Sequence, residues 1–266
     1  MPRKTRFLVA LACLSCMSLS AQDKEARNRL AAAHAQYYTP TASGLKSFHC
    51  DASIDWKAML SRFAGTDIPD DNPALKFLQT VHLAVNDDLH GTGELEWTST
   101  VEPPNDRKAG MQQMQDGLQT MIAGFFQSWN AYMNGSMVPL PDHTVTITKS
   151  SDGVHLSGTS KDSTFDEDYD KNMLLTQALV VSPSLKVLAK PTYTGTPDGL
   201  ILSSLTSLVH QPPTSPEVEA TFRVEYAKVD SYQIPSHVVF DIKNTGMFEF
   251  GFSACKVTVA DWAKKN

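Results

Sequence analysis

Apolar and polar residues alternate along most of the second half of the chain. From about residue 140 onward, apolar side chains recur at every second position, a period typical of strands with one buried face. Polar turns such as Lys149–Gly153 separate these segments and predict hairpins between them. The expected strands span residues 144–148, 154–157, 174–181, 186–189, 200–208, 218–227, 237–242 and 247–259.

The last of these strands changes its register once. Its apolar residues keep one parity up to Phe252 and the other parity from Cys255 onward. One extra residue near Ser253–Ala254 would return all of them to the same face, so the pattern predicts a β-bulge at this position.

The first half of the chain mixes helical and strand patterns. Good helix formers over residues 22–37, followed by Pro40, predict an N-terminal helix. Alternation over residues 45–56 predicts a strand, and residues 57–64 are expected to form a short helix. Further strands are expected over residues 77–85 and 94–98.

Residues 107–133 carry large apolar side chains at helical spacing. The row comprises Met111, Met114, Leu118, Met121, Ile122, Phe125, Trp129 and Tyr132. Beside this row, Gly110, Gly117 and Gly124 recur every seven residues, and Asn134–Gly135 ends the helix. Each glycine costs about 1 kcal/mol relative to alanine. Either a close approach to the sheet or a ligand chain lying along the backbone would offset that cost.

Two interpretations of this amphipathic helix are open. Its apolar side either packs as core against the sheet or lines a cavity for a variable apolar ligand, for which flexible and polarisable methionines are suited. In the second case, the residues of the apolar wall would be Met114, Leu118, Met121, Ile122, Phe125 and Trp129.

The strands are joined by short turns, and the crossover helices that a parallel sheet needs are missing. The pattern therefore predicts an α+β fold in which one curved antiparallel sheet, a half-open β-barrel, wraps around the long helix. The N-terminal helix is expected to be the second main helix of this fold. Residues 22–266 are expected to form a single domain with the helical insertion at about 107–133.

Residues 1–21 have the layout of a secretory signal peptide. A basic tip precedes an apolar run over residues 7–19, and small residues follow at Ser18, Ser20 and Ala21. The run is shorter than the roughly 20 residues that span a bilayer, although an N-terminal anchor is the alternative. We expect an exported protein, either periplasmic or extracellular.

The charge of the chain argues against several kinds of partner. The formal net charge is −6, and loss of the basic leader would make it three charges more negative. An acidic chain is a poor partner for nucleic acid and for anionic lipid surfaces. Since no second apolar run approaches membrane-spanning length, we also expect no integral membrane span.

Two cysteines, Cys50 and Cys255, remain after the leader. In an oxidising compartment an isolated pair has one intramolecular connectivity, so a disulfide between them is one expectation. Two buried thiols in separate strands are the alternative.

The sequence offers little catalytic or metal-binding chemistry. The S-x-x-K spacing of Ser43–Lys46 lacks the companion motifs of serine acyl-enzymes. The group His82, Asp87, Asp88 and His90 has metal-ligand chemistry, but a polar turn explains it equally well. The run Asp166–Asp170 resembles the start of a calcium loop without its glycine and final glutamate, which favours a solvated turn. No catalytic residue, metal or cofactor is therefore expected.

The C-terminal part resembles the LolA-like lipoprotein-carrier superfamily. The resemblance rests on a strand at Gly44–Phe48 and on the segment Phe222–Pro235. That superfamily often has a Tyr…Val-Asp-Gly…Pro hairpin before its last strands, with Ser231-Tyr232 in place of the glycine step here. The matching residues are Tyr226, Val229, Asp230 and Pro235. The resemblance implies an unclosed β-barrel with helices over its mouth, an apolar cavity for acyl chains and no catalytic residues.

The leading expectation is therefore an exported, non-enzymatic binding protein. Its partner would be a lipid or apolar small molecule, or an acylated protein, held between the curved sheet and the helices. One alternative is a structural or interaction module of the cell envelope with a filled core. A hydrolase with an unrecognised site is the third.

Overall fold

The computed structural model describes residues 28–29, 31–103, 107–134, 145–160, 162–211 and 217–263. The expected signal peptide lies outside these ranges. Of the expected helix over residues 22–37, the structure describes residues 28–29 and 31–37, and residues 28–29 and 31–34 are helical. The described helices are α2 (Trp56–Ala64), α3 (Pro73–Leu78) and α4 (Lys108–Met133). The strands are β1 (Leu45–Ile54), β2 (Val81–Asp87), β3 (Glu94–Ser99), β4 (Val145–Ser150), β5 (Gly153–Ser160), β6 (Ser163–Asp170), β7 (Leu175–Val181), β8 (Lys186–Thr196), β9 (Gly199–His210), β10 (Val218–Val229), β11 (Tyr232–Ile242) and β12 (Gly246–Val259).

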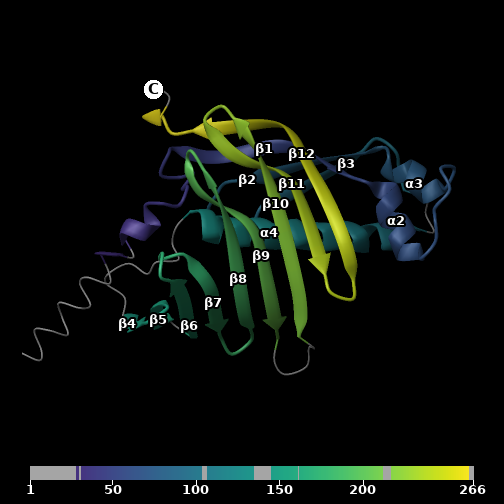
Figure 1. Cartoon of the computed structure of the whole chain (residues 1–266). Coiled ribbons are helices and arrows are strands. Elements are labelled where there is room, and N and C mark those ends of the chain that lie inside the picture. The colour runs from purple at the N-terminus through teal and green to yellow at the C-terminus, as the bar shows by residue number, and fades with distance from the viewer. Residues whose placement is uncertain are drawn as a thin grey trace, which may run out of the picture.

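All twelve strands form one open sheet in the order β3-β2-β1-β12-β11-β10-β9-β8-β7-β6-β5-β4. Every pair is antiparallel, and only the β1–β12 pair joins strands that are not consecutive in the chain. The α+β class with a large antiparallel sheet and one long helix is thus confirmed. Because α4 connects the two edge strands, β3 and β4, it crosses one face of the sheet (Figure 1). We call that face the inner face.

Aromatic side chains fill the space between α4 and the sheet. Phe125 packs edge-on against Phe222 of β10, with ring centroids 5.0 Å apart. Phe126 contacts Phe48 of β1 at 5.7 Å. The indole Nε1 of Trp129 donates a hydrogen bond of 2.9 Å to the Tyr226 hydroxyl. The helix is therefore anchored to strands from both the beginning and the end of the chain.

The structure corrects three boundaries expected from the sequence. Residues 77 and 78 belong to α3 rather than to a strand, because the Asn72 side chain caps the helix and Pro73 occupies its first turn. Trp56 begins α2 instead of ending β1. The acidic run Asp166–Asp170 lies in strand β6, so the expectation of a solvated turn was wrong.

The expected β-bulge in the last strand is confirmed. The register between β1 and β12 shifts between His49 and Asp51, and Ala254 adopts a positive φ of 50°. The extra residue places Phe252 and Cys255 on the same face despite their odd spacing.

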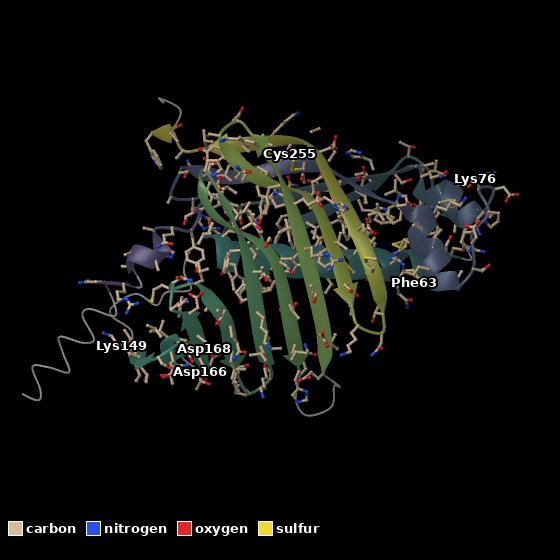
Figure 2. The ribbon with its side chains drawn as sticks, in the orientation of Figure 1. Phe63, Lys76, Lys149, Asp166, Asp168 and Cys255 are labelled. Carbon is tan, nitrogen blue, oxygen red and sulfur yellow. A yellow bond between two sulfur atoms is a disulfide. The ribbon has the colours of Figure 1, made fainter. Side chains whose placement is uncertain are left out.

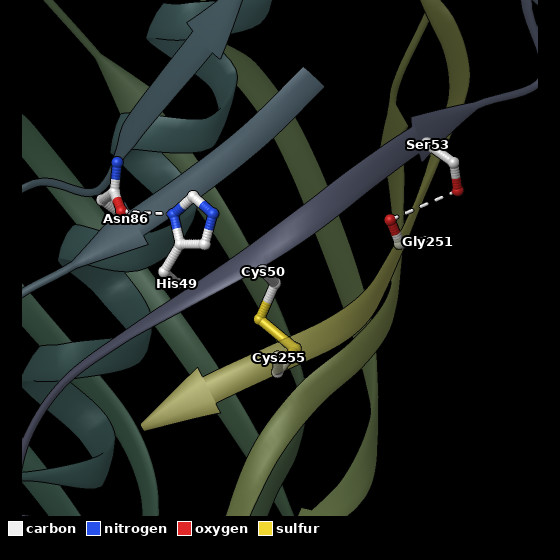
Figure 3. Close-up of a disulfide and its surroundings, with 6 residues drawn as sticks. All are labelled: His49, Cys50, Ser53, Asn86, Gly251 and Cys255. Carbon is white, nitrogen blue, oxygen red and sulfur yellow. Dashed lines mark hydrogen bonds between the residues drawn. A yellow bond between two sulfur atoms is a disulfide. The ribbon is translucent and has the colours of Figure 1, made fainter. Parts of the chain in front are cut away.

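The Cys50–Cys255 disulfide is also present, with Cα atoms 4.0 Å apart. It joins β1 to β12, where two segments far apart in the sequence become neighbours (Figure 3). The disulfide therefore covalently links the N-terminal strands β1–β3 to the meander β4–β12.

Candidate functional site

The six expected wall residues on α4 fall into two groups. Leu118, Ile122, Phe125 and Trp129 are buried in the core. Met114 and Met121 are half-buried and pack against that core from its margin. The assignment of all six to a ligand wall remains a prediction, and only the two methionines retain surface beside the helix.

The glycines of α4 are exposed. A Cβ atom added at Gly110, Gly117 or Gly124 would meet no atom within 4 Å, apart from the neighbouring helix backbone. A close approach to the sheet therefore does not explain why glycines occur here.

A cavity of about 70 Å³ lies beside Leu118, between α2, α4 and the turn that joins β11 to β12. Its lining includes Met59, Phe248 and the Arg62 side chain. This volume is well below the roughly 300–1,000 Å³ of typical small-molecule sites. It would hold at most a small part of an apolar ligand.

A larger apolar surface lies on the inner face next to α4. Four small residues oppose one another across neighbouring strands and form one row, and four valines form the next row. We call these two rows the apolar strip: Ala178, Ala189, Ser207 and Ala220, with Val180, Val187, Val209 and Val218.

The strip shares the face that α4 contacts, since Ala220 lies two residues before Phe222 on β10. The valine row is only partly covered: Val180 is 39% exposed, Val218 is 42% exposed, and Val187 and Val209 are half-buried, whereas Ala178 and Ala189 in the row of small residues are buried. In Figure 1, strands β8–β10 continue past α4 toward the turns at the lower ends. Contiguous exposed apolar surface of this kind marks an interaction site more often than isolated residues do.

The half-buried methionines share one side of α4. Met121 precedes Phe125 by four residues and Met114 precedes Met121 by seven, so both lie on the Phe125 side of the helix. Phe125 in turn faces Phe222 and Phe240, on β10 and β11. Phe125 thus places α4 next to the strand that carries Ala220, while Met114 lies about 16 Å along the helix, toward the β3 edge.

The carboxyl group of Asp87 has a structural role at the other end of α4. It accepts hydrogen bonds from the Leu89 amide at 2.9 Å and from the Asn130 side chain at 3.0 and 3.1 Å. Burial raises the pKa of Asp87 to about 6, although these hydrogen bonds lower it. Asp87 therefore helps to attach the helix to the turn after β2. Within the described ranges, no group of three or more His, Cys, Asp or Glu side chains is arranged to hold a metal.

The sequence did not single out Glu167, whose side chain is only 5% exposed. It stands between Asp166 and Asp168 on β6 (Figure 2), which contact His155 at 3.4 and 2.8 Å. Because alternate residues of a strand point to opposite faces, Glu167 points away from these neighbours and into the protein. Burial raises the pKa of Glu167 to about 7, and a hydrogen bond from the Tyr169 hydroxyl acts in the opposite direction. The only sequence signal was the strand alternation of Glu167 and Tyr169, hidden in an acidic run.

Comparison with protein-family models, with curated proteins and with solved structures finds no match for this chain. Of the helices in the described parts of the chain, none is long and apolar enough to cross a membrane.

Proposed function

We propose that the protein is an exported, non-enzymatic binding protein that holds a lipid or another apolar molecule on the inner face of its sheet. The observation that carries this proposal is the apolar strip, which lies partly exposed on the face of the sheet that Phe125 of α4 contacts. Burial of an alkyl chain there would contribute about 0.8 kcal/mol per methylene group. The ligand would lie alongside the helix, because the space beneath it is filled by Phe125 and Trp129.

We further propose that the sheet is the half-open barrel of a LolA-like carrier. Two features support this. First, α4 contacts distant parts of the sheet: Phe126 meets Phe48 of β1, and Phe125 meets Phe222 of β10. Second, α4 binds the β3 edge, where the Leu95 amide donates to Gln119 Oε1 at 2.7 Å and Gln119 Nε2 donates to the Gly93 carbonyl at 3.3 Å. A helix held at an edge and across the middle suits a sheet that bends around it.

A structural or interaction module with a filled core is the second candidate. The complete burial of Ile122, Phe126 and Trp129, together with the small volume beside Leu118, supports it. In this case the apolar strip would contact another protein instead of a lipid.

Ala220→Trp tests the first proposal, because it places a large ring in the row of small residues. The matched control is Arg223→Trp, which lies on the same strand with an exposed side chain on the opposite face. We expect a fluorescent fatty acid to bind the native protein and the control equally, and the Ala220 variant about tenfold more weakly, a change of about 1.4 kcal/mol. Native mass spectrometry combined with organic extraction would identify any co-purified lipid. Recovery of lipid-free protein that takes up neither a fluorescent fatty acid nor a fluorescent alkyl probe with a neutral or cationic head would reject the proposal in favour of the second candidate.

A further inference from the structure

Glu167 is a buried acid without an evident structural task. Its strand partners are Leu156 and Ala178, both apolar and buried. Among the residues that the structure describes, it forms no ion pair, and only Tyr169, two positions along the same strand, donates a hydrogen bond to it, at Oε2 and 2.9 Å. A bond within one strand does not attach any other element. Since burial of a carboxyl group with a single hydrogen-bond donor destabilises a fold, its presence suggests a binding role.

Tyrosines from three segments lie near this carboxyl group, and a fourth tyrosine contacts one of them. We call Tyr37, Tyr132, Tyr169 and Tyr193 the tyrosine cluster. The rings of Tyr37 and Tyr193 meet edge to face with centroids 4.9 Å apart. Burial raises the pKa values of Tyr132 and Tyr193, and the nearby Glu167 charge raises them further. Glu167 and the four rings therefore share one small region.

Several polar atoms in this region could form further hydrogen bonds. No described residue donates to Glu167 Oε1 or bonds with the Tyr132 and Tyr193 hydroxyls. Since no fully buried side-chain nitrogen or oxygen of the described residues lacks a partner, these oxygens retain access to solvent. Tyrosine faces attract cations, and a carboxylate surrounded by aromatic rings is the arrangement that binds alkylammonium groups in other proteins. A carboxylate ligand, in contrast, would place two negative charges together in an apolar setting.

The region lies at one end of the apolar strip. Glu167 is paired with Ala178, the first residue in the row of small side chains that runs across β8 and β9 to Ala220 on β10. At the usual spacing of about 4.8 Å between strands, the distance from β6 to β10 is roughly 19 Å. A carbon–carbon bond of about 1.5 Å advances an extended zigzag chain by about 1.3 Å along its axis, so that length suits an alkyl chain of about 15 carbons.

We propose that Glu167 and the tyrosine cluster bind the ammonium head of an amphiphile whose alkyl chain lies on the apolar strip. The placement of the alkyl chain rests on the function proposed above, whereas the preference for a cationic head depends on Glu167 and the four tyrosines. A primary ammonium would donate to Glu167 Oε1 and to the Tyr132 and Tyr193 hydroxyls. A quaternary ammonium would instead be held by its charge and by the ring faces.

Four probes with the same alkyl chain test this inference: dodecylammonium, dodecyltrimethylammonium, dodecanol and dodecanoate. Their affinities would be measured by titration calorimetry at neutral pH, below micelle-forming concentrations. We expect at least one of the two cations to bind about tenfold or more tightly than dodecanol and dodecanoate. Which cation binds more tightly separates hydrogen-bonded recognition from recognition by the ring faces, and either result supports the inference.

Glu167→Gln should remove most of the preference for the cation while leaving the affinity for dodecanol unchanged. Asp166→Asn is the matched control, because it removes the same charge from the opposite face of the same strand. Tyr132→Leu should weaken binding of both cations, whereas Tyr132→Phe should retain dodecyltrimethylammonium. Circular dichroism and a thermal melt would confirm that each variant is folded.

The possible failures are distinguishable. If all four probes bind with equal affinity and Glu167→Gln changes none of them, the inferred head group is wrong and the proposed function stands. If none of the probes binds to the folded native protein, both proposals fail. Ala220→Trp should weaken all four probes alike, which separates the contribution of the strip from that of the acid.

Discussion

At the scale of single residues, two buried carboxyl groups differ in how they are satisfied. Asp87 accepts hydrogen bonds from a backbone amide and from Asn130, and these attach α4 to the β2–β3 turn. From the described residues, Glu167 accepts one, from its strand neighbour Tyr169. Burial raises the pKa of both, to about 6 for Asp87 and to about 7 for Glu167. The less satisfied group is the better candidate for a binding role.

The raised pKa of Glu167 predicts that stability falls as the pH rises. Because the folded protein favours the protonated acid, its contribution is fully present below the ordinary pKa of 4.5 and is lost as the pH passes through about 7. At about 1.4 kcal/mol per pKa unit, the loss is on the order of 3 kcal/mol. Glu167→Gln should therefore be more stable than the native protein at pH 8, and the advantage should shrink toward pH 4.5.

Urea unfolding at a series of pH values would measure this difference in the free energy of unfolding. Asp87 remains in the variant, so a shallower fall between about pH 4 and 6 should persist. Asp166→Asn should not reproduce the effect, since Asp166 faces the other side of β6. Parallel curves for Glu167→Gln and the native protein would show that Glu167 titrates normally.

The sequence identified some residues of the proposed site and missed others. The apolar row of α4 was evident because its spacing repeats, but spacing could not separate the filled core at Phe125 from the margin at Met121. Glu167 was missed because its acidic neighbours made the segment resemble a solvated turn. The apolar strip consists of small and β-branched residues that meet only through the register of four strands, which no local pattern contains.

At the scale of elements, α4 is a long helix whose exposed glycines lower its stability. A side chain at Gly117 or Gly124 would contact nothing within 4 Å beyond the helix backbone, so alanine should fit without displacing any neighbour. Gly117→Ala and Gly124→Ala should each stabilise the protein by about 1 kcal/mol, because alanine loses less backbone entropy in a helix. A thermal melt or urea titration would detect the gain.

Gly93→Ala provides the opposite control. Its Cβ atom would lie under 3 Å from three atoms of the Phe126 side chain, which is fully buried. We expect a loss of about 1–3 kcal/mol from overpacking. If alanine at position 117 or 124 destabilised the protein as well, the exposed face of α4 would have a neighbour that the static structure does not show.

Most elements followed from local pattern, and the exceptions have physical reasons. The β-bulge at Ala254 was predictable because it changes the parity of a long strand. Helix α3 was missed because its apolar residues also fit a strand, while the Asn72-Pro73 start signal is only two residues long. Strand β6 was missed because polar side chains cover its outer face and conceal the alternation of Glu167 and Tyr169.

At the scale of the whole molecule, the pairing of β1 with β12 joins the first strand of the chain to the last. We call this pairing the seam. Neighbouring strands follow one another in sequence everywhere in the sheet except between β1 and β12. The antiparallel order could be expected from the short turns, but the pairing of the first strand with the last could not, because it depends on contacts about 200 residues apart. The expectation of a disulfide was the one sequence feature that joined these segments.

Removal of this disulfide should weaken the seam more than the rest of the sheet. The Cys50–Cys255 link closes a loop with a sequence separation of 205 residues, and the chain-entropy model assigns about 5 kcal/mol to a loop of that length. The double variant Cys50→Ala with Cys255→Ala should therefore lose several kcal/mol in the free energy of unfolding. The native protein under reducing conditions should show the same loss, which controls for the altered side chains.

Hydrogen exchange should accelerate first in β1–β3, because the meander β4–β12 keeps all its sequential pairings. If exchange rose equally in β1–β3 and in β7–β10, the sheet would unfold as one unit and the disulfide would not stabilise the seam in particular.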